Sequence, residues 1–595
     1  MRRQFWIQPF SAVLALGIAT LATAAPKVGY LKIEDEYPER PTMPSFLGLG
    51  DSSATFRQLV DSIYAVADRP FKLDGLVVRL TNAKLPTTQI EELGTALDRV
   101  RATGTKVHIF TEIYGPAELL LGAHADEVIV QTGGAVSFPG LYAEEMFLAD
   151  ALGAIGITPD YVQIGDYKGA SEPMSRSEPS PEWNENINQL LDGIYANMRS
   201  SLAAGRGLTD RGLDRALKEA FFASPETAIK VGVVDSAVDR MDLDEHLEDA
   251  YGGDFDWDAS IGPTDSTTPD FASMGFFEAF TELMTMLEPQ ESRTKRDTIA
   301  IVHIDGAIID GESKSGGLLQ SAGVGSLTIR KVLADLEDDQ NVKGVIIRIN
   351  SPGGSAIASE SIWQGLQRLG EEKPVWASVG TMAASGGYYI AVGTQKIFVD
   401  PSSIVGSIGV VEGKLALGGL YKKFHINVVP RTRGPRASIM GGLTPWSDDE
   451  RALIRQRMTE TYEQFVDRVK AGRPGIDIST SAEGRLFTGK NSLSMHMADK
   501  IGGIHETVGA LADALQLRAG SYDVLDYPPP PSIEEYIEKA LPMARTAAPM
   551  VGSAAALREL FGEARFNQLR DHLTALLELR TEPVLLTSPR VLLFK

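Results

Sequence analysis

A serine followed by two glycines is the residue of this chain whose surroundings point most directly to chemistry. Ser385 stands in Met382-Ala383-Ala384-Ser385-Gly386-Gly387-Tyr388, where small neighbours allow a substrate backbone to come close. Upstream, Asn350-Ser351-Pro352-Gly353-Gly354 follows the apolar run 345–349 and places free backbone N–H groups at a strand end. Acyl transfer requires a nucleophile and hydrogen-bond donors for the oxyanion. We therefore hypothesise a hydrolase with Ser385 as nucleophile, although this serine would also suit a tight helix start.

The elements that would position these residues occur twice along the chain. In each half, short apolar runs with the character of buried strands alternate with helical stretches, which indicates βαβ units and mainly parallel sheet. The sequence therefore predicts an α/β protein built by tandem duplication. The matching strands are 28–33 and 299–304, 76–80 and 345–349, 107–110 and 375–378, and 127–130 and 396–399.

The first half lacks the chemistry that the second half carries. Lys396 follows Glu127 by 269 residues, and the same offset places Ser385 opposite Pro116. The loop 82–86 stands where the glycine pair of 350–354 stands in the second half, and it contains no glycine. We therefore expect the nucleophile and the oxyanion donors to come from the second half alone.

One lysine of the first half has no counterpart in the second. Lys168 lies in Gly165-Asp166-Tyr167-Lys168-Gly169-Ala170 after a predicted strand at 160–164, and the matching region 428–434 contains no lysine. A lysine acts as a general base only when burial lowers its pKa from ~10.4 toward neutrality. A Ser385–Lys168 dyad is therefore a hypothesis, and a solvated loop lysine is its alternative.

Other routes to an activated serine find less support in the sequence. The residues around Ser385 do not form a G-x-S-x-G elbow, and no H-E-x-x-H motif is present. Two of the eight histidines, His124 and His505, lie near predicted turns and remain open as the base of a triad. We expect neither a metal ion nor a cofactor.

The composition and the N-terminal residues restrict the class of protein and its cellular location. The chain has 595 residues, a net charge of −22 and no cysteine, which argues against nucleic acid as a partner and excludes disulfides. Arg2 and Arg3 precede an apolar run at 10–25, and Ala22-Thr23-Ala24 fits a signal cleavage site. We therefore expect export, with this segment either cleaved or kept as a membrane anchor.

These features divide the chain into five predicted parts. A linker rich in Gly, Asp, Ser, Thr and Pro separates the two halves, and a run of four prolines at 528–531 opens the C-terminal part. The predicted parts are a signal peptide or signal-anchor (1–25), a first repeat (27–251), a linker with an amphipathic helix (252–297), a second repeat (298–520) and a mostly helical tail (521–595).

With its tandem repeat, its serine motif and its lysine motif, the chain resembles the long form of the signal peptide peptidase A family from about residue 28 to at least 517. The resemblance implies Ser385 as nucleophile and Lys168 as general base. It also implies that Ser407, within Gly406-Ser407-Ile408-Gly409, orients the lysine; without it, Ser407 would be a plain turn serine. The implied oxyanion donors are the N–H groups of Gly354 and Gly386, with Gly353 the less favoured neighbour.

The same resemblance implies a fold, a substrate and an assembly. Each repeat would have a Clp protease-like, or crotonase-like, fold, and the dyad would form between the two halves of one chain. The protein would be a bowl-shaped homo-oligomer, a tetramer, on the periplasmic face of the bacterial inner membrane, or periplasmic if the signal is cleaved. It would degrade cleaved signal peptides and other extended apolar peptides. A crotonase-type acyl-CoA enzyme and a non-catalytic scaffold are the alternatives.

Overall fold

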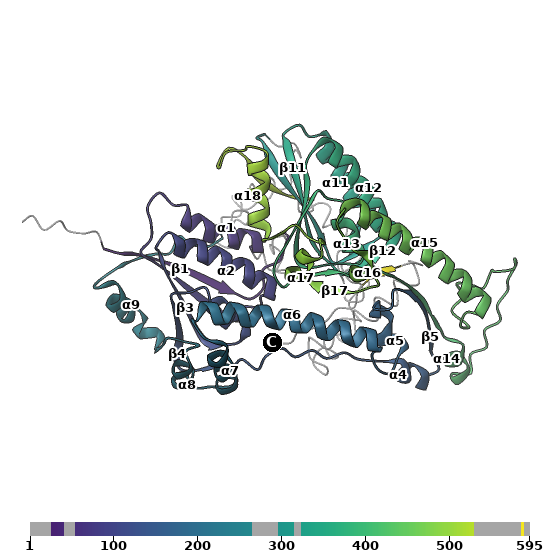
Figure 1. Ribbon diagram of the computed structural model, residues 1–595, viewed down its shortest axis with the longest axis horizontal. Coiled ribbons are helices and arrows are strands. Elements are labelled where there is room, and N and C mark those ends of the chain that lie inside the picture. Colours follow the sequence, from purple (N-terminus) through teal and green to yellow (C-terminus); the bar gives the residue numbers. More distant parts are fainter. Residues whose placement is uncertain (1–24, 41–53, 264–294, 315–322, 529–584, 588–595) are drawn as a thin grey trace, which may run out of the picture.

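Two sheets with the same strand arrangement organise the molecule (Figure 1). The computed structural model describes residues 25–40, 54–263, 295–314 and 323–528, together with the backbone of 585–587. The first sheet has the order β6-β4-β3-β2-β1-β7, and all of its pairings are parallel. The second has eight strands: its main path is β17-β15-β13-β11-β8-β19, and β14 pairs with β13 and with β18. Its β15–β17 pairing is antiparallel. The duplicated, mainly parallel α/β fold that the sequence predicts is therefore confirmed.

Helices connect the parallel strands of the first repeat and cover its sheet. Its elements are β1 (Lys27–Glu34), α1 (Phe56–Ala67), β2 (Gly75–Thr81), α2 (Thr87–Ala102), β3 (Lys106–Tyr114), α3 (Pro116–Gly122), β4 (Glu127–Val136), α4 (Ala149–Ala154), β5 (Thr158–Ile164), η1 (Gly169–Ser171), α5 (Glu172–Ser175), α6 (Pro181–Gly205), α7 (Asp210–Glu219), α8 (Pro225–Val231), β6 (Ser236–Val238), η2 (Arg240–Asp242), α9 (Leu243–Tyr251) and β7 (Asp256–Asp258).

The second repeat has the same alternation, with additional short strands around its centre. Its elements are β8 (Thr298–Asp305), β9 (Ala307–Ile309), β10 (Gly323–Gly325), α11 (Ser326–Asp338), β11 (Val342–Ser351), β12 (Gly353–Ser355), α12 (Ala356–Glu372), β13 (Val375–Ala384), α13 (Gly386–Ala391), β14 (Lys396–Val399), β15 (Ile404–Gly406), β16 (Val410–Ala416), α14 (Gly418–Lys423), α15 (Asp448–Gly472), α16 (Ile478–Ser481), β17 (Leu486–Thr488), α17 (Gly489–Ser494), β18 (Lys500–Ile501), α18 (Ile504–Ala514), β19 (Asp523–Tyr527) and β20 (Leu585–Thr587).

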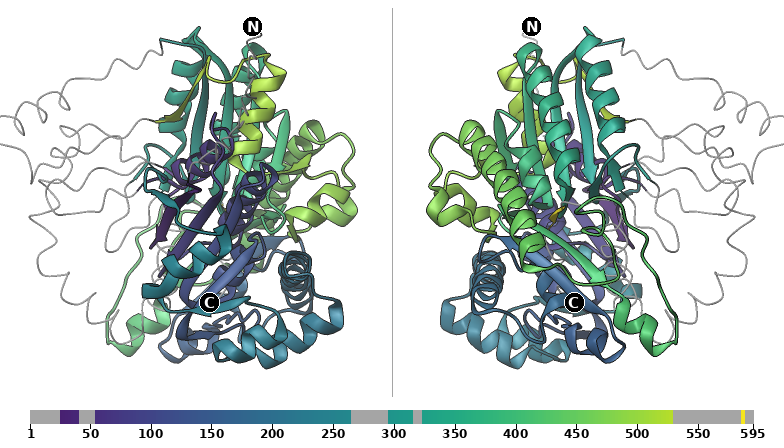
Figure 2. Two further views of the ribbon diagram at one scale, coloured as in Figure 1. Left: turned by 90° about the vertical axis from the view of Figure 1, so that its left-hand side faces the viewer. Right: turned by 90° about the vertical axis from the view of Figure 1, so that its right-hand side faces the viewer.

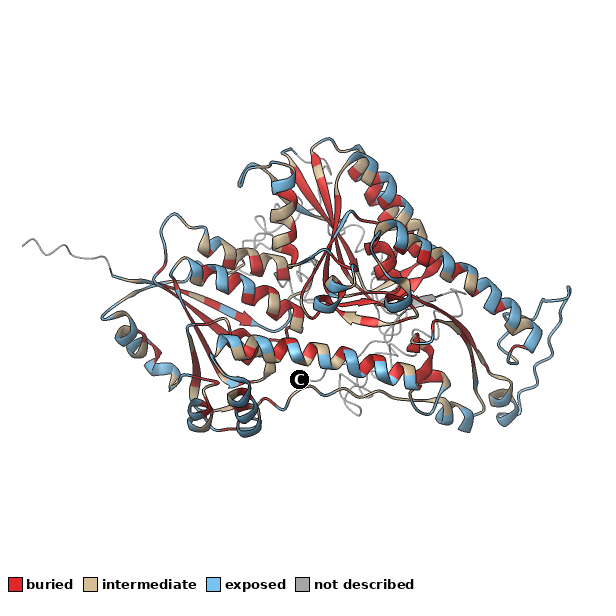
Figure 3. Cartoon of the chain, viewed as in Figure 1, coloured by how far each residue is buried: buried red, intermediate tan, exposed pale blue. Residues whose placement is uncertain are grey.

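Strand register is reproduced from one repeat to the other. Leu76 of β2 lies opposite Val107 of β3, and Val345 of β11 lies opposite Val375 of β13. The next pairing is also repeated, because β3 meets β4 at the positions where β13 meets β14. The central strands are buried along most of their length, as expected for parallel strands covered by helices on both faces (Figure 3).

The first repeat extends one strand into the second. After β4 the chain crosses the molecule, and β5 pairs antiparallel with β16 over seven residue pairs (Figure 1). This pairing belongs to a third sheet, with the order β10-β9-β12-β20-β16-β5, that joins both repeats. The long helix α6 then returns beneath the second repeat, where the Asn186 side chain accepts a hydrogen bond from the backbone N–H of Leu486 (Figure 2).

A buried ion cluster also connects the repeats. Arg348 of β11 is 1% exposed, and its guanidinium lies 2.6 Å from Glu92 of α2 and 3.0 Å from Glu39. Ser378 Oγ accepts a further hydrogen bond from this guanidinium. Because both carboxylates belong to the first repeat, the orientation of the two halves depends on the pairing of a buried charge.

Two short strands lie outside the repeat boundaries that the sequence predicts. β7, in the predicted linker, pairs with β1, and β19, in the predicted tail, pairs with β8. The predicted linker helix falls largely within 264–294 and the predicted helical tail within 529–584, and both of these ranges lie outside the described residues. The domain boundaries therefore stay predictions.

Candidate active site

Ser385 lies at the point where β13 ends and the short helix α13 begins. It is fully buried and takes a φ of 55°, a left-handed conformation that is uncommon for a residue with a side chain. Its backbone N–H donates to the carbonyl of Gly406 at 2.8 Å, which holds this conformation. Backbone strain of this kind persists only where the surrounding structure enforces it, and it occurs often at functional sites.

Lys168 reaches Ser385 from the other repeat. The lysine follows β5, and its Nζ lies 2.7 Å from Ser385 Oγ. The same Nζ donates to the backbone carbonyl and to the Oγ of Ser407, both at 2.9 Å. The structure therefore brings together the three side chains that the sequence and the resemblance single out, 217 and 239 residues apart in sequence from the lysine.

The environment of Lys168 favours the neutral amine. The side chain is 1% exposed, and burial lowers its pKa well below the usual value, because an ammonium ion is poorly solvated there. A neutral amine within hydrogen-bond distance of a serine hydroxyl is able to accept its proton. This is the condition that the dyad hypothesis requires.

A loop between α16 and β17 contacts both the segment that contains Lys168 and Ser407. The carbonyl of Glu483 accepts from the N–H of Tyr167, and the carbonyl of Arg485 accepts from the N–H of Ser407 at 2.6 Å. Gly484 packs against the lysine backbone so closely that a Cβ there would lie 2.5 Å from the nitrogen of Lys168. Sequence reasoning missed this loop, and a glycine between two charged residues is the one signal that marks it.

The two predicted oxyanion donors lie next to each other and beside Ser385. Gly386 is the first residue of α13, where backbone N–H groups have no partner within the helix. A Cβ at Gly386 would lie 3.2 Å from the nitrogen of Gly354, which shows how closely the two backbones approach. The N–H of Gly353 already donates to Ser351 Oγ at 3.1 Å, so Gly354 is the better placed of the pair.

Gly354 also needs to be glycine on steric grounds. Its φ is 158°, and a Cβ there would lie 2.0 Å from the carbonyl oxygen of Ile308 in β9. The strand β12 therefore packs against β9 at a distance that only a residue without a side chain permits. This contact fixes the backbone beside the nucleophile.

The histidines that the sequence left open have other partners. His124 Nδ1 lies 2.7 Å from Asp98, and His505 Nδ1 lies 3.0 Å from Asp61 while its ring stacks on Tyr64. In the described part of the chain, neither histidine is hydrogen-bonded to Ser385. The structure therefore offers Lys168, rather than a histidine, as the base.

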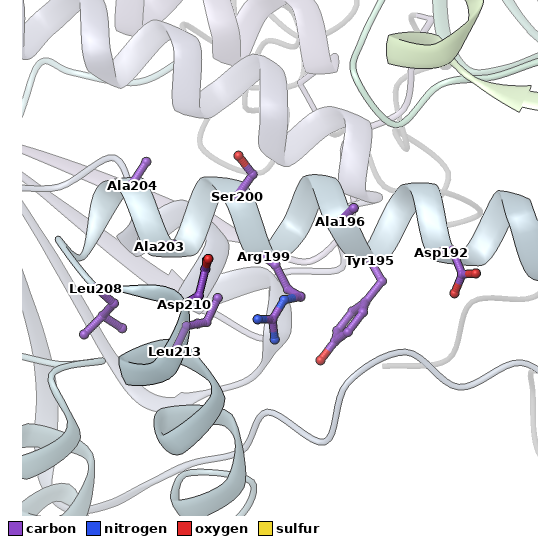
Figure 4. Close-up of a pocket in the computed structure, with 10 residues that line it drawn as sticks. All are labelled: Asp192, Tyr195, Ala196, Arg199, Ser200, Ala203, Ala204, Leu208, Asp210 and Leu213. Atoms are coloured by element: carbon purple, nitrogen blue, oxygen red, sulfur yellow. The ribbon is translucent and has the colours of Figure 1, made fainter.

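A surface hollow on the first repeat is separate from this site. It has a volume of about 500 Å³ and lies between α6 and α7, where Tyr195, Arg199 and Asp192 project from one face of α6 (Figure 4). Arg199 is paired there with Asp214 at 2.7 Å. None of the five predicted site residues lines this hollow.

Comparison with known proteins agrees with the duplication and shows the family. The model of peptidase family S49 matches residues 99–252 and 367–518, so one match contains Lys168 and the other contains Ser385. "Protease 4" of Haemophilus influenzae is 31% identical over 467 residues, which are 76% of this chain and 71% of that protein. "Protease 4" of Salmonella typhi is 25% identical over 466 residues, with the same coverage.

A plant protein is similar over the same length. The "Serine protease SPPA, chloroplastic" of Arabidopsis thaliana is 27% identical over 464 residues, which are 77% of this chain and 65% of that protein. Both repeats, and not a single domain, are thus common to this chain and its relatives. The chain belongs to peptidase family S49 and is a serine protease of the long, tandem-repeat signal peptide peptidase A type.

Proposed function

We propose that this protease cleaves peptide bonds with Ser385 as nucleophile and Lys168 as general base. The observation that carries the proposal is the 2.7 Å separation of Lys168 Nζ and Ser385 Oγ in a fully buried setting. The lowered pKa of Lys168 supports the assignment, because a neutral amine is needed to accept the proton. Ser407 orients the lysine through its carbonyl and hydroxyl oxygens.

The reaction follows from these positions. Neutral Lys168 accepts the proton of Ser385 as Oγ attacks the peptide carbonyl, and the N–H groups of Gly354 and Gly386 bind the oxyanion. Each such donor contributes about 3 kcal/mol to transition-state stabilisation. The lysine then passes the proton to the leaving amine as the C–N bond breaks. Water, deprotonated by the same lysine, then attacks the acyl-enzyme. The ester C–O bond breaks, the lysine returns the proton to Ser385 Oγ, and the second product leaves as its carboxylic acid.

The proposed substrates are cleaved signal peptides and other extended apolar peptides. The resemblance to the signal peptide peptidase A family supports this substrate class. The N-terminal apolar run at 10–25 would hold the protein at the inner membrane, facing the periplasm. That run lies outside the described residues, and no helix within the described ranges is long and apolar enough to span a bilayer. A homotetramer is part of the same proposal.

The dyad is tested by covalent labelling of the nucleophile. Wild type, Ser385→Ala, Lys168→Ala and Lys414→Ala are treated with a fluorophosphonate probe, and the labelled peptide is identified by mass spectrometry. Lys414 is the matched control, since it is also a buried lysine but donates only to the carbonyls of Ile439 and Gly441. We expect label on Ser385 in wild type and in Lys414→Ala and no label in the other two. Undiminished label in Lys168→Ala would rule out the lysine as base.

A further inference from the structure

Arg485, in the loop between α16 and β17, connects the lysine segment of the first repeat with Ser407 of the second. Its guanidinium carbon lies 3.9 Å from the centre of the ring of Tyr167, the residue that precedes Lys168. Its backbone carbonyl accepts the N–H of Ser407 at 2.6 Å. The side chain of one residue therefore contacts the segment that carries the proposed base, and its backbone holds the serine that accepts from that base.

The guanidinium of Arg485 depends on the Tyr167 ring for its main partner. Among the described residues, no carboxylate forms an ion pair with it, and its one side-chain hydrogen bond runs from Nη1 to the carbonyl of Ala482 at 3.2 Å. The side chain is partly buried, so water solvates it only in part. A cation in this setting is attracted to the face of an aromatic ring. The stack on Tyr167 is therefore the contact that fixes the position of this arginine.

The loop that carries Arg485 interlocks with the lysine segment through two glycines, one from each repeat. Gly484 has a φ of 87°, and a Cβ there would lie 2.5 Å from the nitrogen of Lys168. Gly165 has a φ of 106°, and a Cβ there would lie 2.8 Å from the carbonyl carbon of Glu483. Glu483 itself takes a φ of 60°, a conformation that only surrounding contacts maintain. Because the two backbones leave no room for a side chain between them, movement of the loop would displace Lys168.

We propose that Arg485 is a positioning residue that, by stacking on Tyr167, holds Lys168 at the distance from the nucleophile that proton transfer requires. The inference rests on the proposed function, since Arg485 has this role only if Lys168 is the base. Among the described residues, Arg485 makes no hydrogen bond to Ser385 or to the lysine amine. It acts through the Tyr167 ring and through the backbone of its own loop.

Loss of the stack should change the charge state of Lys168. Burial is the cause of the lowered pKa of this lysine. When Tyr167 is no longer held, water reaches the amine, and hydration of the ammonium ion raises the pKa toward its ordinary value. A larger fraction of the protein then has a protonated, inactive base at neutral pH, whereas at alkaline pH the amine is neutral again. The expected signature is therefore a loss of reactivity that higher pH reverses.

The test removes the stack from either side and follows the reactivity of Ser385 across the pH range. Arg485→Leu removes the cation and Tyr167→Leu removes the ring, and the rate of fluorophosphonate labelling is measured for each. We expect both variants to react on the order of 10-fold more slowly near pH 7, to show their inflection at higher pH, and to reach the wild-type rate beyond it. The double variant should be no slower than either single variant, because both remove the same interaction.

A conservative variant and a matched control separate positioning from general damage. Tyr167→Phe keeps the ring and loses only a hydroxyl that donates to Glu185 at 3.3 Å, so it should retain the wild-type pH profile. Arg199→Leu removes another guanidinium that lies over an aromatic ring, 5.8 Å from the centre of Tyr195 on α6, and should also react like wild type. If Arg485→Leu does not fold, Tyr167→Leu and Tyr167→Phe still compare the presence and absence of the stack.

The remaining outcomes decide between this inference and the function on which it rests. Slower labelling with an unchanged pH profile in both leucine variants would overturn the positioning role, because a general loss of structure has no reason to be reversed at high pH. Wild-type rates in both would overturn it as well. Undiminished labelling in Lys168→Ala would instead overturn the proposed function, and with it this inference.

Discussion

The two repeats differ most where the third strand of each sheet passes into a helix. In the second repeat, Ser385 precedes α13, and Gly386 provides a free N–H at the first helical position. In the first repeat, Gly115 precedes α3, and the first helical position is Pro116, which has no N–H. The first repeat thus has the same scaffold but lacks a serine at the position of the proposed nucleophile and an N–H at the position of one proposed oxyanion donor.

What the first repeat supplies is packing and the lysine of the proposed dyad. Arg79 and Arg348 occupy matching positions in β2 and β11, yet Arg79 pairs with a half-exposed Glu112 while Arg348 is buried against Glu39 and Glu92 of the other repeat. The proposed site is also shared between the repeats. The strand β5 of the first repeat pairs with β16 of the second and thereby places Lys168 beside Ser385. One repeat thus carries the proposed nucleophile, and the other carries the proposed base.

The largest expected effect comes from removing either residue of the proposed dyad, one from each repeat. Ser385→Ala and Lys168→Ala should each lower kcat/KM on the order of 10⁴-fold or more, because members of a nucleophile–base unit act together. Peptide hydrolysis by purified variants measures this loss. Since both residues lie in one chain, a mixture of the two variants should stay inactive; recovery on mixing would place the dyad between chains.

Breaking the buried ion cluster tests the packing role of the first repeat. Arg348→Ala leaves two buried carboxylates without their arginine, and we expect a loss of about 3–5 kcal/mol in the free energy of unfolding. Arg79→Ala removes the matching arginine, which is also buried but whose partner Glu112 is 42% exposed and stays solvated, so it should cost less than Arg348→Ala. Denaturant titration of the two variants compares them, and equal losses would contradict the difference between the repeats.

A proline at the first position of α13, as in α3 of the first repeat, tests the contribution of the proposed oxyanion donor. Gly386→Pro places proline where Pro116 stands and removes one N–H donor, which should lower kcat by about 10²–10³-fold. Gly386→Ala keeps that N–H and is the control for the added Cβ, which would lie 2.6 Å from Ser359 Oγ. Steady-state kinetics of both variants separate the two contributions. Similar losses in both would point to crowding and not to the missing donor.

Much of the fold could be predicted from sequence, because apolar strands at a constant offset mark both repeats. Lys168 and Ser385 could be proposed as a pair because each occurs in only one repeat. Their 2.7 Å contact could not be predicted, since it depends on β5 joining β16 across the molecule. The left-handed φ of Ser385 and the packing of Gly484 on the lysine likewise arise from tertiary contacts, which local sequence patterns do not reveal.

The smallest effect concerns the stability that the first repeat gives up by burying Lys168. The folded-state pKa of this lysine is lowered by burial, whereas the unfolded chain keeps the ordinary value of about 10.4. Between these two values the unfolded state binds the extra proton, so the contribution of the lysine to stability becomes less unfavourable as pH rises. Lys168→Met should therefore raise Tm by about 1–3 °C, with the largest gain at acidic pH and a shrinking gain toward alkaline pH.

Deprotonation of Lys168 in the folded protein should also make the wild-type kcat/KM rise with pH to a plateau. Scanning calorimetry and rate profiles across the pH range measure both trends. A stability gain that stays constant with pH would mean that the folded and unfolded chains hold this lysine in the same charge state.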